Sequence, residues 1–504
     1  MSWKSILGWS SLSACHRQAC RAASPVLCGI AVTLSLQTVT PVHAQGLLQN
    51  SKFLGQAGNP EQEEMKENAQ EAYQAGQYPD VVELTSAVLA QNPQDHVALY
   101  LRASARVEMG ISGRDLNTLR AGIEDSRNAL RFGGNQVINY YLPYFYGMTG
   151  LAQLEGRKEH AEVVVQFADS VLARPTLTPD DRANILFQRA NARVYLKDYD
   201  AATKDFTSAI AAVPAHLGAH LGLADCHLRA GKTDLAQAAF TAAVQSNAEN
   251  PLVYNNRGMF FQQQGRHAEA IADFTQAIKL NPGFVVAVTN RGYAALQMGD
   301  GAAAERDLNL AMQMAPNVPL NYSLRGTARM AQGRIPEAMQ DYNQALKLDP
   351  QNPMAYADLG FAQYFTKQYP QALAAFDQAV KLDPNLRFLD PWRFMAMLQV
   401  GQGEAAPAKF KDSLTKAFVD RDWTDKVLQY LSDAMPEEQL LASVEKTNRL
   451  QQAAQICEGW YFIAEKKKRA GDQAGATAAY QKAIESGATQ LSAYRGAQMS
   501  LRAN

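Results

Sequence analysis

Prolines recur at an interval of 34 residues, and this interval limits the chain to a repeated helical unit. They stand at Pro282, Pro316, Pro350 and Pro384, and each follows a similar amphipathic stretch such as "EAIADFTQAIKLNP" (residues 269–282). Because proline cannot continue a helix, each one should mark the end of a helix. A single helical hairpin cannot bury its own apolar face, so a chain that repeats one must stack the copies.

The spacing also fixes which positions of the unit are small and which are large. With each proline as position 32, six units begin at 34-residue steps from Ala183. Small residues at positions 8 and 20 would let the two helices of a hairpin approach closely, and a large residue at position 24 would fill the space between neighbouring hairpins. Glycine at position 15 would close the first helix. Position 24 holds Phe206, Phe240, Phe274, Leu308, Tyr342 and Phe376.

This pattern resembles the tetratricopeptide repeat (TPR). The resemblance covers residues 183–384 and implies an all-α fold, a right-handed superhelical solenoid of antiparallel helix pairs. One further unit matches at residues 457–489, where Trp460, Ala464 and Gly471 fall at positions 4, 8 and 15. The order of the C-terminal third, from "PWRFMAMLQ" to "LSAYRGA", resembles bacterial envelope repeat proteins of the new-lipoprotein-I (NlpI) type.

These observations divide the chain into segments. Terminal units of solenoids are often atypical because they face water. We therefore expect, in order, a signal peptide at 1–44, a flexible mature N-terminus at 45–60, irregular helix pairs at 61–175, six regular units at 183–384, off-register helical pairs at 391–455, a closing unit at 457–489 and a C-terminal capping helix or tail at 490–504.

The N-terminus has the pattern of an export signal. Lys4, Arg17 and Arg21 are its charged residues, an apolar run follows at 26–36, and "PVHAQ" offers a cleavage site after Ala44. A basic region, a short apolar core and small residues before the cleavage point are typical of secretory signal peptides. We expect an exported, periplasmic protein. An uncleaved N-terminal membrane anchor is the alternative, and "LSAC" (residues 12–15) leaves lipidation as another.

Charge balance and motif content exclude several classes of function. The chain has 48 Lys+Arg and 49 Asp+Glu, so nothing predicts the basic face that nucleic acid requires. Cys226 and Cys457, the cysteines beyond the signal, are interpreted as small buried apolar residues. No phosphate loop, nucleophile elbow or zinc-protease motif occurs, so we expect no enzyme activity and no cofactor.

Three histidines are the best candidates for a metal site. His216, His220 and His227 lie four and seven residues apart, so one helix face could carry ligands. The repeat pattern gives a simpler interpretation, because His220 and His227 occupy positions 4 and 11, which normally pack inward. We therefore predict no metal site here, and an enzyme function would require these histidines to bind one.

The first helix of each unit should line the concave face, at positions 2, 5, 9, 12 and 13. These positions are poor in Lys and Arg and rich in Met, aromatic and amide side chains, which suits a peptide with apolar anchors. Alternatively, some of these side chains only pack against a neighbouring helix or a terminal segment folded back. The predicted groove residues are Asn191, Asn255, Met259, Gln262, Thr289, Tyr293, Leu296, Ser323, Thr327, Phe361, Tyr364 and Phe365.

The sequence therefore predicts a non-enzymatic scaffold of the bacterial cell envelope that binds peptide or protein partners. The narrower resemblance implies an adaptor that brings an envelope protease or a peptidoglycan hydrolase to its client. The alternative function is a structural subunit of an envelope secretion or polysaccharide-export assembly. Self-association into a homodimer is compatible with both, and membrane contact is expected only through an uncleaved signal.

Overall fold

The computed structural model describes residues 59–134, 137–417, 421–489 and 491–502. Within these ranges every regular element is a helix and no strand forms. The predicted signal peptide lies outside the described residues, as does nearly all of the predicted flexible segment at 45–60. The chain divides into an N-terminal unit that ends at Arg257 and a C-terminal unit that begins at Gly258.

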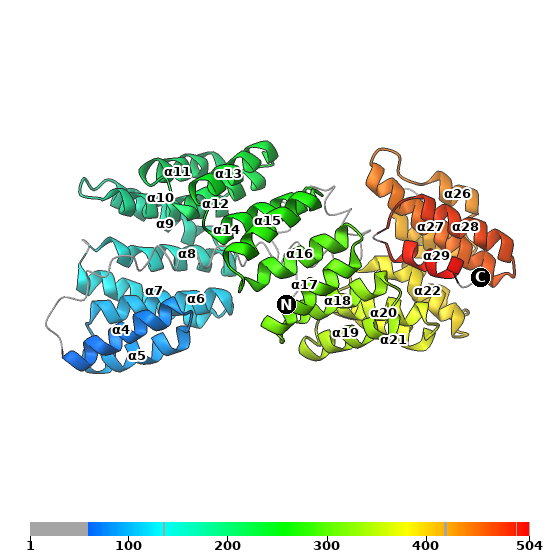
Figure 1. The fold of residues 1–504 in the computed structure, drawn as a ribbon, viewed down its shortest axis with the longest axis horizontal. Coiled ribbons are helices and arrows are strands. Elements are labelled where there is room, and N and C mark those ends of the chain that lie inside the picture. The colour runs from blue at the N-terminus through cyan, green and yellow to red at the C-terminus, as the bar shows by residue number, and fades with distance from the viewer. Residues whose placement is uncertain (1–58, 135–136, 418–420, 490, 503–504) are drawn as a thin grey trace. The chain divides into compact units, whose positions relative to one another are not determined.

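The N-terminal unit is built from helices that pair with their neighbours along the chain (Figure 1). They are α4 (Pro60–Gln74), α5 (Tyr78–Gln91), α6 (His96–Ser112), α7 (Leu116–Gly133), the 3-10 turn η3 (Ile138–Tyr140), α8 (Tyr141–Glu155), α9 (Lys158–Leu172), α10 (Pro179–Tyr195), α11 (Tyr199–Ala212), α12 (Leu217–Arg229) and α13 (Thr233–Ser246). Three of the pairs, α4 to α9, fall in the segment predicted to be irregular. Helix α14 (Pro251–Gln263) crosses the boundary between the units.

The C-terminal unit continues the pairs and then changes character. Its regular helices are α15 (His267–Leu280), α16 (Val285–Gln297), α17 (Gly301–Met314), α18 (Pro319–Ala331), α19 (Ile335–Leu348), α20 (Pro353–Phe365) and α21 (Tyr369–Leu382). After them come η4 (Arg387–Leu389), α22 (Asp390–Gln399), α23 (Ala406–Lys409), α24 (Lys411–Thr415), α25 (Trp423–Leu431), α26 (Glu437–Ala442), α27 (Arg449–Arg469), α28 (Gln473–Glu485) and α29 (Ser492–Arg502). No helix in the described ranges is long and apolar enough to cross a lipid bilayer.

Helix ends follow the repeat as predicted. Helices α15, α17, α19 and α21 each end two residues before one of the regularly spaced prolines. Gly231, at position 15, has φ +73° and ends α12 in the left-handed conformation. Lys197 and Lys367 occupy the same position in units that lack the glycine, and they adopt φ 65° and 61°. The turn geometry is therefore kept even where the residue type makes it costly.

The large residue at position 24 packs both within its own hairpin and against the next. A Cβ on Gly326 would lie 2.6 Å from Cε1 of Tyr342, so the ring needs a glycine opposite it in the same unit. A Cβ on Gly222 would lie 2.5 Å from Cε1 of Phe206, which belongs to the preceding unit. Both rings are buried. The predicted roles of the small and large positions are thus confirmed.

Buried arginine–aspartate pairs, which the sequence analysis missed, join the helices of a unit and link neighbouring units. Arg325 on α18 donates to Asp341 on α19 at 2.6 Å and to Asn309 on α17 at 2.7 Å. Arg291, 34 residues earlier, binds Asp307 at 2.7 Å and Thr275 at 3.2 Å in the same pattern. Each arginine therefore fixes its own second helix and the second helix of the unit before.

We expect Asp341→Ala to lower the free energy of unfolding by about 2 kcal/mol, because two partly buried guanidinium groups lose a shared carboxylate acceptor. Asp341 is buried, and Arg329 also donates to it at 2.9 Å. Asp307→Ala is the matched control: this carboxylate is more exposed and binds one arginine, so the loss should be near 1 kcal/mol. Urea unfolding followed by circular dichroism measures both. Equal losses would contradict the role given to the second arginine.

Some predicted boundaries differ from the structure. Helix α10 begins at Pro179 rather than Ala183, because Thr178 caps it by accepting from the Asp181 amide. Helix α27 begins at Arg449, so the predicted division between 391–455 and 457–489 falls inside one helix. The rest of 391–455 forms α22 to α26, helices of four to ten residues rather than regular pairs. Gly401, with φ +78°, and Pro436 lie between these short helices and separate them.

Candidate protein-binding groove

The predicted groove residues lie on the first helices of the 34-residue repeats, at positions that share one side of each helix. Asn191 is on α10, and α14 carries Asn255, Met259 and Gln262. Asn191 and Asn255 belong to the N-terminal unit, and the others to the C-terminal unit. There α16, α18 and α20 contact one another in turn. These three helices bring together Thr289, Tyr293, Leu296, Ser323, Thr327, Phe361, Tyr364 and Phe365.

These side chains are more covered than open-groove residues would be. Asn191, Gln262 and Phe365 are half-buried, and the other nine are buried. The structure therefore favours the alternative interpretation for part of the set, in which the side chains pack inside the chain. Contact of these residues with a partner stays a prediction.

A polar track crosses α16 and α18. Thr289 Oγ1 donates to Asn321 Oδ1 at 2.9 Å, which connects the two helices. Thr327 Oγ1 donates to the Ser323 carbonyl at 3.1 Å and lies 3.4 Å from the Tyr342 hydroxyl. Ser323 Oγ and Asn321 Nδ2 are buried and have no hydrogen-bond partner among the described residues. Two polar groups of this track are therefore buried without a hydrogen-bond partner among the described residues.

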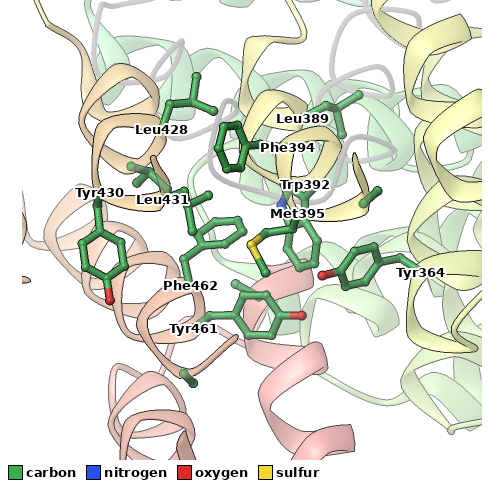
Figure 2. Close-up of a cluster of buried hydrophobic side chains, with 14 of the residues drawn as sticks. Tyr364, Leu389, Trp392, Phe394, Met395, Leu428, Tyr430, Leu431, Tyr461 and Phe462 are labelled. Carbon is green, nitrogen blue, oxygen red and sulfur yellow. The ribbon is translucent and has the colours of Figure 1, made fainter. Parts of the chain in front are cut away.

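The aromatic residues of α20 belong to a core shared with the C-terminal helices. Phe361, Tyr364 and Phe365 lie 5.0, 5.3 and 5.8 Å from the ring of Trp392 on α22, measured between ring centroids. Trp392 stacks on Tyr461 of α27 at 4.9 Å. Figure 2 shows Tyr364, Trp392 and Tyr461 in this cluster. The C-terminal helices thus fold back over the last regular unit.

A buried carboxylate connects the same region to the closing unit. Glu465 on α27 accepts from the Tyr480 hydroxyl and lies 3.5 Å from the Tyr364 hydroxyl. Burial and the charge of Glu465 raise the pKa of Tyr364. Tyr364 therefore remains a neutral donor to this carboxylate and serves the internal packing.

Two of the three histidines, His216 and His220, are held by hydrogen bonds, and His220 and His227 lie inside the stack. His216 caps α12 through Nδ1, which accepts from the Ala219 amide at 3.0 Å. His220 Nε2 lies 2.8 Å from the Pro214 carbonyl. His220 and His227 are buried, and burial lowers the pKa of His227. No three His, Cys, Asp or Glu side chains gather in metal-binding geometry in the described part of the chain.

The cysteines also lie inside the fold. Cys226 and Cys457 are free thiols with buried side chains. Burial raises the pKa of Cys457 to about 12, so this thiol stays protonated and unreactive at neutral pH. The interpretation of both cysteines as small apolar residues is confirmed.

The sequence analysis missed a buried acid in the N-terminal unit. Glu108 on α6 is 2% exposed, and its Oε1 has no hydrogen-bond partner among the described residues. Burial raises the pKa of Glu108 to about 8. Burial and the Glu108 charge also raise the pKa of Tyr73 and Tyr146. The four-residue spacing of Tyr100, Ser104 and Glu108 was the available signal, but the predicted groove began at the regular units.

Comparison with known families identifies the repeats. Models of the tetratricopeptide repeat match residues 194–256, 251–284 and 353–386, and a model described as TPR repeat matches residues 326–365. These matches cover less than half of the chain. No curated protein matches it.

Several solved structures show partial similarity. A structure of pilF from Pseudomonas aeruginosa is 21% identical, with a TM-score of 0.36, over 41% of this chain and 94% of that chain. MamA from residue 41 onward, from Desulfovibrio magneticus RS-1, is 20% identical, with a TM-score of 0.31, over 34% and 96%. YrrB, whose title describes a TPR protein with an unusual peptide-binding site, is 17% identical, with a TM-score of 0.32, over 40% and 99%.

The family matches agree with the helix pairs and with the 34-residue register. The match at 194–256 lies in the N-terminal unit, the match at 251–284 crosses its boundary, and the matches at 326–365 and 353–386 lie at the end of the regular repeats of the C-terminal unit. Residues 194–284 and 326–386 are therefore tetratricopeptide repeats, in agreement with the helices that they form.

Proposed function

We propose that the chain is a non-enzymatic adaptor of the bacterial cell envelope that presents one face of α16, α18 and α20 to peptide or protein partners. Tetratricopeptide repeats suggest a protein-interaction scaffold, and this supports a protein partner. Envelope proteases and peptidoglycan hydrolases are the proposed partners, following the resemblance of the C-terminal third to NlpI-type proteins. The export signal predicted at residues 1–44 is the reason to propose the envelope as the site of action.

The polar track beside apolar anchors carries this proposal. Ser323 Oγ and Asn321 Nδ2 have no hydrogen-bond partner among the described residues, and Phe365 on α20 is a half-buried apolar side chain. A buried polar group without a partner costs roughly 1–3 kcal/mol. Because both groups are buried, a peptide backbone could satisfy them and recover part of that cost only if its binding opens this face.

Crosslinking inside an exporting bacterium tests the proposal. A photoreactive aromatic residue replaces Gln262 or Phe365, which are half-buried, and the control replaces Leu310 on the second helix α17, which is 39% exposed. We expect a protease or hydrolase to be captured from the first two positions and not from Leu310.

Other results would change the conclusion. Capture of a secretion or polysaccharide-export component would support the structural-subunit function instead, and a crosslink to a second copy would indicate a homodimer. The same proteins captured from all three positions, or none from Gln262 and Phe365, would contradict the groove.

A further inference from the structure

The same cluster of two tyrosines beside a glutamate occurs twice in the chain. The segment "YQAGQYP" contains Tyr73 and Tyr78, and "YFTKQYP" contains Tyr364 and Tyr369. The ring centroids lie 5.4 Å apart in the first pair and 5.3 Å apart in the second. In each cluster, burial raises the pKa of both tyrosines, and the charge of a glutamate on another helix raises it further. The glutamates are Glu108 on α6 and Glu465 on α27.

The two glutamates differ in the hydrogen bonds that they receive. Glu465 accepts from the Tyr480 hydroxyl and lies 3.5 Å from the Tyr364 hydroxyl. In the other cluster, Glu108 Oε1 and the Tyr73 hydroxyl have no hydrogen-bond partner among the described residues, although Glu108 and Tyr73 are both buried. Hydroxyl donors stabilise a buried carboxylate, and a buried charge without donors is strongly unfavourable. Glu108 is therefore suited to the interior as the neutral acid.

Glu108 forms no ion pair with a described residue, and burial is the cause of its raised pKa. Its titratable neighbours are Tyr73 of α4, Tyr78 of α5 and Tyr146 of α8. Other charged or titratable groups of the surrounding helices bind elsewhere or are exposed. Those bound are Lys66 with Glu63 and Asp95, Arg102 and Arg106 with Asp125, Arg120 and His160 with Glu155, Arg127 with Glu124, His96 with Tyr140, and Arg131 over the Phe132 ring. The exposed carboxylates of α4 and α5 are Glu61, Glu64, Glu67, Glu71, Asp80 and Glu83.

Glu108 lies where the first described helical pair meets the next helix. Helices α4 and α5 pair with each other, and both contact α6, which carries Glu108. Tyr73 and Tyr78 belong to this first pair and are the neighbours of the acid on that side. In a stack of repeats each pair contacts mainly its neighbours, so one pair can separate while the others stay folded. Separation of α4 and α5 would give Glu108 access to water.

We propose that ionisation of Glu108 releases the helical pair α4 and α5 from the rest of the N-terminal unit. The protonated acid is a neutral group that the interior accepts, whereas the carboxylate needs the water that this pair excludes. The device therefore makes the attachment of one repeat depend on pH. It does not depend on the adaptor function.

The direction of the pH effect follows from the two states of the pair. Burial raises the pKa of Glu108 to about 8 while the pair is attached, and the ordinary value of 4.5 returns once the pair has separated. The attached state binds the proton more tightly, so the attachment is strongest below about pH 4.5 and weakens as the pH rises to about 8.

Amide hydrogen exchange of the full chain at pH 6 and pH 8 tests the proposal. Each rate is divided by the intrinsic rate at the same pH, so that protection factors are compared. In the parent, the protection of α4 and α5 should fall at least about tenfold between the two pH values, while α10 and α11 of the same unit keep theirs. In Glu108→Gln, which cannot ionise, the protection of α4 and α5 should stay the same.

Two further variants separate ionisation from other effects of substitution. Glu108→Met places an apolar side chain of similar length at the same point, and it should also remove the fall in protection. Glu83→Gln removes a carboxylate from α5 where the side chain is exposed, so it should behave like the parent. All variants keep His96 and His160, so titration of these histidines contributes equally to each.

Three results would overturn the proposal. An equal fall in the parent and in both Glu108 variants would assign the pH effect to another group. An equal fall in α10 and α11 would mean that a larger region unfolds and that no single pair is released. Constant protection of α4 and α5 in the parent would mean that ionisation of Glu108 does not loosen this pair. None of these results would affect the crosslinking test of the adaptor function.

Discussion

Trp392→Ala is expected to lower the free energy of unfolding by about 3–5 kcal/mol, the usual range for removing a buried aromatic side chain. Trp392 is 2% exposed and touches the rings of Phe361, Tyr364 and Tyr461, which come from opposite sides of the cluster. The cavity left by alanine would separate α20 from α27. We expect this variant also to speed amide exchange in α29, because the support beneath Tyr461 and Phe365 is lost.

Trp460→Ala is the matched control for this substitution. Trp460 is half-buried on α27, and Lys482 lies over its ring at 4.0 Å from the centroid. Its removal should cost about 1 kcal/mol, because the ring is only partly buried and leaves a smaller cavity. Urea unfolding followed by circular dichroism gives both values. Equal losses would mean that Trp392 does not hold the C-terminal helices on the last regular unit.

Glu108→Gln is expected to stabilise the chain at neutral and alkaline pH. Burial raises the pKa of Glu108 from its ordinary value of 4.5 to about 8. The folded state therefore holds the proton more tightly than the unfolded state, so stability is fully present below about pH 4.5 and is lost progressively as the pH rises to about 8. At one pKa unit per about 1.4 kcal/mol, the loss between pH 5 and pH 8 is on the order of 3 kcal/mol.

Glutamine keeps the shape of the protonated acid and cannot ionise, so the variant should lack this part of the pH dependence. Urea unfolding at pH 5 and pH 8 measures the free energy of unfolding of the variant and of the parent. The difference between the two proteins isolates the effect of Glu108, because the other titrating groups contribute equally to both. Glu83→Gln on α5 is the control, since Glu83 is exposed and should change neither value. If Glu108→Gln and the parent lose stability equally between the two pH values, the carboxyl does not titrate as the burial implies.

The regular part of the fold could be predicted because each of its features depends on residues that lie close together in the sequence. Helix ends at 34-residue steps, the small residue at position 8 and the ring at position 24 depend on residues within one or two units. The left-handed turns at Lys197 and Lys367 were not predicted, because lysine gives no sign of that conformation. There the packing of the two helices imposes the turn on whatever residue stands at position 15.

The burial of the candidate site was harder to predict, because the residues that cover it lie far away in the sequence. The positions of Phe361, Tyr364 and Phe365 on the first-helix face follow from the register, but their burial depends on Trp392 and Tyr461, up to about one hundred residues away. The pattern of a single unit contains no information about which distant helix returns to cover it. Glu108 was missed for a related reason, since its unit departs from the register used to choose groove residues.

The arginine clamps between units make the number of repeats adjustable. Arg291 and Arg325 are interchangeable, because each needs an aspartate in its own unit and a small polar residue in the unit before. Loss of residues 285–318 in a recombination event would set Arg325 beside Thr275, the hydroxyl that Arg291 uses now. Arg329 and Arg334 would lose Glu305, which lies in the deleted segment, but both contacts of Arg325 would be present. The contacts made by Arg291 and Arg325 therefore survive the gain or loss of a whole repeat, whereas the Glu305 pairs depend on the particular neighbour.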